Sequence, residues 1–187
     1  MKSNEELFAE LIFMNECGDR AHILALTDPD GIRSGKSGYS FGKVQMDTRN
    51  NPASLKCLKE CGFTQDEIHG VVDQACDVRP LNAKLLAHPD IVEKYDEAQL
   101  AHCFNHVASK HIAFESPGGI LALADYVNQY GSIGPQFMAY IDSLHAVVNA
   151  EDVLMFKLDH TKYGKEHPKD CKRRYNNLMS LLKNGRA

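Results

Sequence analysis

Glu16 is the residue whose type and position point most directly to chemistry. Phe8, Ile12 and Glu16 form an i, i+4, i+8 row, so the pattern predicts a carboxyl group on the apolar face of a helix, in its last turn. Burial and the negative end of the helix dipole both raise the pKa of a carboxyl group, which is how a general acid is made. A glutamate that points to solvent, or pairs with Arg20, explains the pattern equally well.

A second carboxylate follows in the next segment. His22–Thr27 (HILALT) and Tyr39–Met46 (YSFGKVQM) are predicted to be the two strands of a hairpin, because residues 28–38 between them are turn-forming throughout. The return strand would bring Asp47 back toward the residues just after Glu16. Asp28 would lie about 16 Å further up the strand, at about 3.3 Å per residue.

This geometry favours Asp47 as the partner of Glu16. A protonated acid opposite an ionised carboxylate is the minimum equipment of a glycoside hydrolase, and a wide separation leaves room for the attacking water of an inverting mechanism. Ser40 and Gln45 fall in the same region and could hold water or sugar hydroxyls. An alternative is that Asp47 only caps the turn into the helix that begins near Asn51.

A polar stripe on the helix predicted for residues 116–130 is a candidate substrate-binding surface. Asp125, Asn128 and Gln129 lie beside its apolar face, and amide side chains both donate and accept hydrogen bonds to sugars. Tyr39 and Tyr130 could add stacking surfaces. A solvated helix face is the alternative.

A metal site is a weaker interpretation. His102 and His106 lie one helical turn apart, but the glutamate of a zinc-protease motif is missing and no other ligand pair has suitable spacing. Histidines on a helix surface explain the pair better, so we expect no metal and no cofactor.

The elements that must position these residues are mainly helical. We expect an α+β fold with a small N-terminal β-hairpin or sheet packed on a bundle of about seven helices, forming a single domain over residues 1–187. Within it, residues 1–50 would hold the catalytic helix and hairpin, and residues 51–187 a helical lobe. Capping boxes, Pro and Gly signals place the helices at about 3–16, 51–62, 64–76, 89–114, 116–131, 135–148, 151–160 and 168–184.

The composition of the chain indicates which partners it can bind and in which compartment it is made. A net charge of −4 with dispersed cations disfavours nucleic-acid binding, and the basic run at 169–174 is typical of a solvated helix face. The six cysteines show no CxxC pair and are expected to be free thiols of a reducing compartment. No long apolar run or signal peptide is present, so we expect synthesis in the cytoplasm and no membrane insertion.

The segment from Glu16 to Asp47 resembles the lysozyme superfamily. GYSFGKVQMD (residues 38–47) is similar to the strand of goose-type lysozymes and related transglycosylases that ends in glutamine, an apolar residue and aspartate. The spacing of Glu16, Ser40 and Asp47 also resembles pesticin and phage-type lysozymes, whose catalytic set is Glu, Thr and Asp. The resemblance covers about 30 of the 187 residues.

The resemblance implies that Glu16 is the acid, that Asp47 positions water, and that Ser40 takes the place of the threonine. Two departures matter. Ser40 is not a threonine, and the DPDG sequence that begins at Asp28 also resembles the hairpin aspartate and glycine of phage-type lysozymes, which makes Asp28 the alternative partner.

The expected function is therefore that of a peptidoglycan-degrading muramidase. It would act on glycan strands in the periplasm or cell wall after release or secretion, as a phage endolysin or as an effector that has an immunity or delivery protein. A lytic transglycosylase, a chitin- or chitosan-cleaving enzyme, and a non-catalytic glycan-binding or interaction module are the alternatives.

Overall fold

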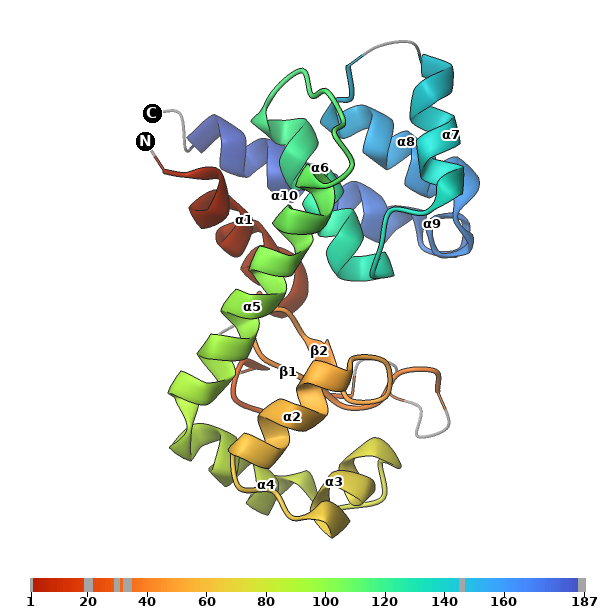
Figure 1. Cartoon of the computed structure of the whole chain (residues 1–187). Coiled ribbons are helices and arrows are strands. Elements are labelled where there is room, and N and C mark those ends of the chain that lie inside the picture. Colours follow the sequence, from red (N-terminus) through yellow and green to blue (C-terminus); the bar gives the residue numbers. More distant parts are fainter. Residues whose placement is uncertain (1, 19–21, 29–30, 32–34, 145–146, 185–187) are drawn as a thin grey trace. The chain divides into compact units, whose positions relative to one another are not determined.

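The computed structural model describes residues 2–18, 22–28, 31, 35–144 and 147–184. The described chain is mainly helical with one two-stranded antiparallel sheet, which agrees with the expected α+β class (Figure 1). In chain order the elements are α1 (Asn4–Ile12), the π-helix η1 (Phe13–Cys17), β1 (Ser40–Phe41), β2 (Met46–Asp47), α2 (Pro52–Glu60), α3 (Gln65–Val72), α4 (Val78–Ala87), α5 (Pro89–Ala108), α6 (Pro117–Tyr130), α7 (Pro135–Leu144), α8 (Ala150–His160), α9 (Lys162–Glu166) and α10 (Pro168–Asn184).

The chain divides into two compact units. Unit 1 comprises Met1–Asn15 and Leu100–Ala187, and unit 2 comprises Glu16–Gln99. Helix α5 begins in unit 2 and ends in unit 1. The single domain stays a prediction. The two compact units divide after residues 15 and 99, whereas the expected subdivision lay after residue 50. The hairpin and helix α2 belong to the same unit because they pack against each other.

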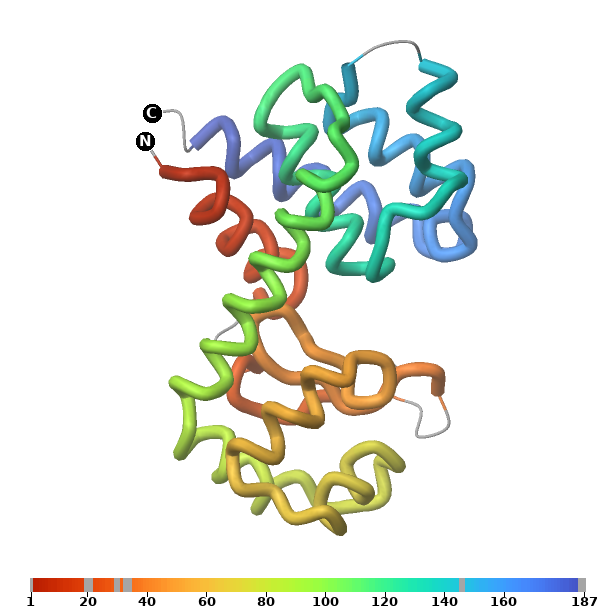
Figure 2. The backbone as a smooth tube through the Cα atoms, in the orientation of Figure 1, coloured from red at the N-terminus to blue at the C-terminus, as the bar shows by residue number. Residues whose placement is uncertain are grey.

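Unit 1 is built around helix α6. The helix packs against α1, α8 and α10, and α1 also packs against α10. Figure 2 shows these first and last helices side by side, red beside blue. The apolar face that the sequence pattern predicts for α6 carries Leu123, Ala124 and Val127, which are fully buried, and Ile120, which is half-buried. Other buried side chains of this core are Phe8, Leu11, Ile12, Phe137, Val153, Phe156 and Leu178.

Unit 2 places the hairpin against the next helices. Helix α2 begins at Pro52 after an Asn51 cap, and α3 begins after Thr64, whose capping box with Glu67 is formed as predicted. Helix α2 packs against β2, and α3 packs against α2. This packing removes apolar side chains from water, which supplies most of the stabilisation. The buried side chains are Phe41, Val44, Met46, Cys57, Leu58, Ile68, Val71, Leu81, Leu85 and Val92.

Most predicted helices begin where expected, but several end earlier and two short helices were not expected. Helix α3 ends at Val72 and not near residue 76, and α7 ends at Leu144 and not near residue 148. Helix α5 ends at Ala108 and not near residue 114, because Lys110 N donates to Val107 O and His111 has a positive φ of 54°. Helices α4 and α9 were not predicted. Pro80 lies in the first turn of α4, where its missing N–H costs little.

The predicted strands are wrong in their boundaries. Residues 22–27 contain no strand, and only Thr27 forms a single antiparallel bridge, with Ser40. Strand β1 and the first residue of β2 lie inside the segment expected to be one strand, and β2 extends one residue beyond it, to Asp47. Gly42 (φ 82°) and Gln45 (φ 51°) adopt turn conformations, and Gln45 N donates to Gly42 O, so the chain reverses there.

Candidate functional site

Glu16 lies in a π-helical turn. Helix α1 ends at Ile12, and Phe13–Cys17 continue as a π-helix with i to i+5 hydrogen bonds. The wider turn breaks the i, i+4 row, so Phe8 and Ile12 are fully buried while Glu16 is only half-buried. The buried polar residue of this turn is Asn15. The expected core position of Glu16 is therefore corrected to a partly accessible one.

The turn that carries Glu16 is attached to the turn of the hairpin. The Cys17 thiol donates to the backbone oxygens of Gly42 at 3.6 Å and Lys43 at 3.5 Å, and it accepts from Gln45 Nε2 at 3.7 Å. Burial raises the pKa of Cys17 to about 11, so this side chain stays a protonated donor at neutral pH. Two segments that are more than 20 residues apart in sequence meet here.

Ser40 and Asp47 face each other across the hairpin. They are paired in the register of β1 and β2, and Ser40 also pairs with Thr27 on its other side. Directly opposed residues of antiparallel strands project to the same face of a sheet. Thr27, Ser40 and Asp47 therefore form a row of two hydroxyls and one carboxylate, although Ser40 itself is buried.

The Asp47 carboxylate closes the turn that leads to α2. Its Oδ1 accepts the backbone N–H groups of Gly38 (3.0 Å), Arg49 (2.7 Å) and Asn50 (3.2 Å), and its Oδ2 accepts Asn50 Nδ2 at 2.8 Å. Burial alone would raise the pKa of Asp47, but these hydrogen bonds outweigh it and lower the pKa below its usual value. The carboxylate is ionised at neutral pH, and Oδ2 retains room for one further donor.

Asp28 is exposed on the loop side of the same row. Its Oδ1 accepts Gly31 N at 3.0 Å, and it directly follows Thr27, which pairs with Ser40. Neighbouring strands lie about 4.8 Å apart, so the row from Thr27 to Asp47 spans about 10 Å. The separation of about 16 Å that favoured Asp47 over Asp28 depended on the wrong strand boundaries. Geometry therefore no longer selects between the two.

Gln45 and Tyr39 flank this row. The Gln45 amide bonds Thr27 Oγ1 at 3.0 Å and donates to Gly42 O at 2.9 Å, so it stabilises the turn as well as lining the region. Tyr39 precedes Ser40 and is half-buried, and its backbone oxygen accepts Thr48 N.

The predicted amide stripe belongs to α6 in unit 1. Asn128 and Gln129 are both half-buried, and Gln129 Oε1 accepts a hydrogen bond from Lys157 Nζ. Asp125, expected on the same polar stripe, is instead buried and paired with Arg174 at 2.9 Å. Sequence reasoning missed this because Asp125 directly follows the apolar row and its partners come from α8 and α10.

Asp96 is a buried carboxylate next to the hairpin turn that was not among the predicted residues. It is buried on α5 in unit 2, where its two oxygens accept the backbone N–H groups of Lys43 (2.9 Å) and Val44 (3.2 Å). Burial raises its pKa to about 6. The available signal was the i, i+4 spacing from Val92, which puts a carboxylate on a buried helix face. Its role is to hold the hairpin turn.

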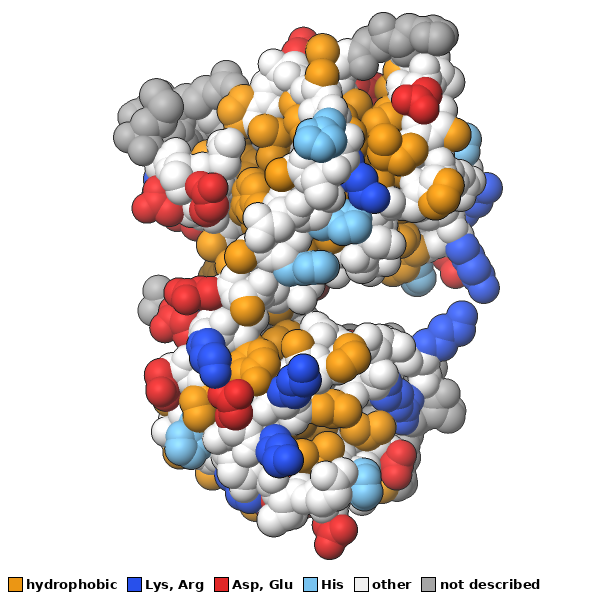
Figure 3. Space-filling view, in the orientation of Figure 1, with side chains coloured by type: hydrophobic (Ala, Val, Ile, Leu, Met, Phe, Trp, Pro, Cys, Tyr) orange, Lys and Arg blue, Asp and Glu red, His pale blue; other side chains and the backbone are white. Residues whose placement is uncertain are grey.

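The histidine pair on α5 shows no metal-binding geometry. His106 Nε2 accepts Ile133 N at 3.0 Å, and the rings of His102 and His106 are 6.1 Å apart. Within the described residues there is no group of three or more His, Cys, Asp or Glu side chains that could hold a metal. None of the described helices is long and apolar enough to cross a membrane. On the face shown in Figure 3, basic and acidic side chains are interspersed in each unit.

Comparisons with known proteins return nothing for this chain: no protein-family model matches it, and no curated protein or solved structure matches it significantly.

Proposed function

We propose that the protein is a lysozyme-like muramidase that hydrolyses the glycan strand of peptidoglycan, with Glu16 as the general acid. The observation that carries the proposal is the meeting of the two motif segments in unit 2. The π turn with Glu16 is bonded through Cys17 to the hairpin turn, and the hairpin is formed by the GYSFGKVQMD segment itself.

In this proposal protonated Glu16 donates its proton to the glycosidic oxygen as the bond breaks. A carboxylate on the opposite face of the sugar orients the attacking water and accepts its proton. Asp47 has one free acceptor position on Oδ2 for that water, and Asp28 is the more exposed alternative. Ser40 and Thr27 supply neighbouring hydroxyls, and Tyr39 and Gln45 of the same unit would bind glycan. Asn128 and Gln129, which belong to unit 1, stay predicted glycan-binding residues of α6. No metal or cofactor takes part.

A lytic transglycosylase is the second candidate, and the surroundings of Asp47 favour it. Four hydrogen bonds lower the basicity of that carboxylate, which makes it a poor proton acceptor for water. A transglycosylase needs Glu16 but can do without a second carboxylate, because a hydroxyl of the sugar itself attacks.

The test is digestion of purified peptidoglycan with the wild type, Glu16→Gln and the control Glu10→Gln, which alters an exposed glutamate of α1. General acid catalysis contributes roughly 10²- to 10⁴-fold, so Glu16→Gln should lose activity by that factor while Glu10→Gln keeps it. Mass spectrometry then separates the two reactions, since a hydrolase leaves reducing ends and a transglycosylase leaves 1,6-anhydro ends. Unchanged digestion by Glu16→Gln refutes the proposal, and a wild type that binds but never cleaves indicates a binding module.

A further inference from the structure

Asn15, the residue before Glu16, is held by three hydrogen bonds from two helices of unit 1. Its Nδ2 donates to Asp125 Oδ1 of α6 at 3.0 Å, and its Oδ1 accepts Asn177 Nδ2 of α10 at 2.9 Å. Its backbone oxygen accepts Arg173 Nη2 at 3.1 Å. Both the side chain and the peptide that leads to Glu16 are therefore fixed. We call Asn15, Asp125, Arg173 and Asn177 the Asn15 clamp.

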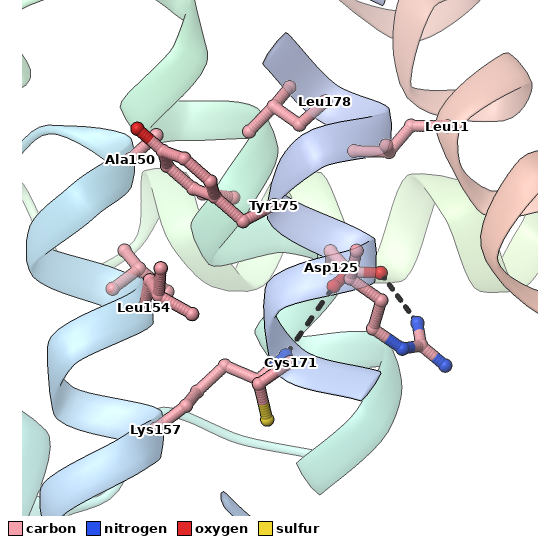
Figure 4. A pocket seen from close by; sticks show the side chains of 11 residues that line it. Leu11, Asp125, Ala150, Leu154, Lys157, Cys171, Tyr175 and Leu178 are labelled. Carbon is pink, nitrogen blue, oxygen red and sulfur yellow. Dashed lines mark hydrogen bonds and ion pairs between the residues drawn. The ribbon is translucent and has the colours of Figure 1, made fainter. Parts of the chain in front are cut away.

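Two buried cations hold Asp125, a member of the Asn15 clamp, in place. Asp125 Oδ1 accepts Arg174 Nη1 at 2.9 Å, and its Oδ2 lies 3.7 Å from Lys157 Nζ, as Figure 4 shows from close by. All three side chains are buried. They lie at a small pocket of about 20 Å³, which is room for about one water molecule.

A second carboxylate completes this ion network. Asp170 binds Arg173 Nη2 at 2.6 Å and Arg174 Nε at 3.2 Å, so the network orients the same arginine that holds the Asn15 backbone. Two aspartates and three cations are thereby joined across α6, α8 and α10.

Such a network is a poor source of stability. Removing charges from water costs about as much as their attraction returns, and apolar side chains of similar volume often stabilise equally well or better. What a fully hydrogen-bonded polar network supplies is a single geometry. Here the network fixes the position of the peptide between Asn15 and Glu16.

That point also has an unusual backbone. A π turn is a rare and less favourable form of helix that persists where its surroundings determine it, and it occurs frequently at functional sites. Without the clamp, residues 13–17 could return to α-helical hydrogen bonding. Glu16 would then rotate toward the apolar row of Phe8 and Ile12.

We propose that Arg173 and Asn177 are positioning residues: through Asn15 they hold the π turn and so fix the direction of the Glu16 side chain. The inference rests on the proposed role of Glu16 as the acid. It assigns a role in catalysis to two residues of α10 that are about 160 positions away in sequence.

Two pairs of variants test it. Asn177→Asp removes the donor to Asn15 without changing the shape of the side chain, and Asn176→Asp makes the same charge change at the exposed neighbour. Arg173→Ala removes the bond to the backbone oxygen, and Lys172→Ala removes one exposed cation beside it. Arg173 is 45% exposed, so its truncation leaves no cavity.

The measurements are kcat and KM on soluble, uncrosslinked peptidoglycan strands, thermal unfolding, and amide hydrogen exchange of residues 13–17. Misplacement of a catalytic group by about 1 Å can cost about 10²-fold, so we expect kcat to fall roughly ten- to a hundredfold in Asn177→Asp and Arg173→Ala, with KM and Tm nearly unchanged. Exchange should accelerate in the π turn alone. Arg173→Lys should restore part of kcat, and the two neighbouring controls should behave as wild type.

Unchanged kcat in both clamp variants overturns the inference, and so does a loss of activity that follows a general fall in Tm. Failure of the proposed function is distinguished by Glu16→Gln measured in parallel. If that variant is inactive while the clamp variants are fully active, only the positioning role is refuted.

Discussion

Asp96 and Gly42 are in such close contact that a Cβ atom added to residue 42 would lie 2.5 Å from Asp96 Oδ1. The hairpin turn can approach the carboxylate only because residue 42 has no side chain. The same glycine has a φ of 82°, which is unfavourable for any other residue type. Packing and backbone conformation therefore both require glycine here.

Gly42→Ala should destabilise the protein by more than the backbone conformation alone explains. We expect about 1–2 kcal/mol for the positive φ and at least as much again for displacing Asp96 from its two N–H donors. Gly62→Ala is the matched control, since Gly62 has a φ of 79° but nothing within 4 Å of an added Cβ. Urea unfolding measures both. Equal losses in the two variants would show that the contact with Asp96 contributes nothing.

Asp96 should make stability fall as pH rises. Its folded pKa of about 6 lies above the ordinary value near 4, so between these pH values the folded state binds more protons than the unfolded state. This contribution is fully present below about pH 4 and is lost by about pH 6. Its size is about 2–3 kcal/mol, at about 1.4 kcal/mol per pKa unit.

The measurement is the difference in unfolding free energy between wild type and Asp96→Asn from pH 4 to pH 7. The difference should decline over that interval, because the variant cannot titrate at this position. A flat difference would mean that the carboxyl group is ionised throughout.

Asp47→Asn and Asp28→Asn should separate the structural and catalytic roles of the two carboxylates. Asp47→Asn loses charge-assisted acceptance of several N–H donors and should cost about 1–3 kcal/mol of stability. Asp28 is exposed and its substitution should leave Tm nearly unchanged. Activity on peptidoglycan is measured well below both Tm values. The partner of Glu16 is the residue whose variant loses activity there, and a lytic transglycosylase would tolerate both changes.

Gln74→Met should stabilise the protein. Gln74 is buried, and neither atom of its side-chain amide finds a hydrogen-bond partner among the described residues. Each unsatisfied buried polar group costs about 1–3 kcal/mol, and methionine has a similar shape without polar atoms. Gln65→Met, at an exposed glutamine of α3, is the control and should give no gain. A destabilised Gln74→Met in urea unfolding would indicate a bound water that satisfies the amide.

The helices could be predicted from sequence because their signals are local. Ser3 with Glu6 and Thr64 with Glu67 form capping boxes where expected, and Pro52 occupies a first helical position. Each signal acts within one turn, so tertiary contacts have little opportunity to override it.

The hairpin could not be predicted because two positive-φ residues decide it. Gly42 and Gln45 reverse the chain inside a segment whose residue types suit a strand, and the Asp96 carboxylate that fixes the turn lies more than 50 residues later. The wrong strand boundaries then gave too long a distance between Asp28 and Asp47, and so favoured Asp47 as the partner of Glu16.

The buried carboxylate in an apolar helical row is Asp96 and not Glu16. Val92 and Asp96 are both fully buried, and burial raises the pKa of Asp96. At Glu16 the π turn changes the direction of the side chain relative to the apolar row. The residue types at positions 13–17 do not predict a π turn. The clamp on Asn15 is equally invisible in sequence, since its partners lie on helices α6 and α10.

The division of the chain has a consequence for its synthesis. Unit 2 is one continuous segment, whereas unit 1 needs the first 15 residues and everything after residue 99. A ribosome therefore releases all of unit 2 while α1 still lacks the helices it packs against. Because Arg173 and Asn177 lie on α10, the surroundings of Asn15 are completed only after that helix has been synthesised. In the proposed enzyme, a chain interrupted before α10 would carry its catalytic glutamate but hold it in no defined direction, so activity would arise only after α10 has been synthesised.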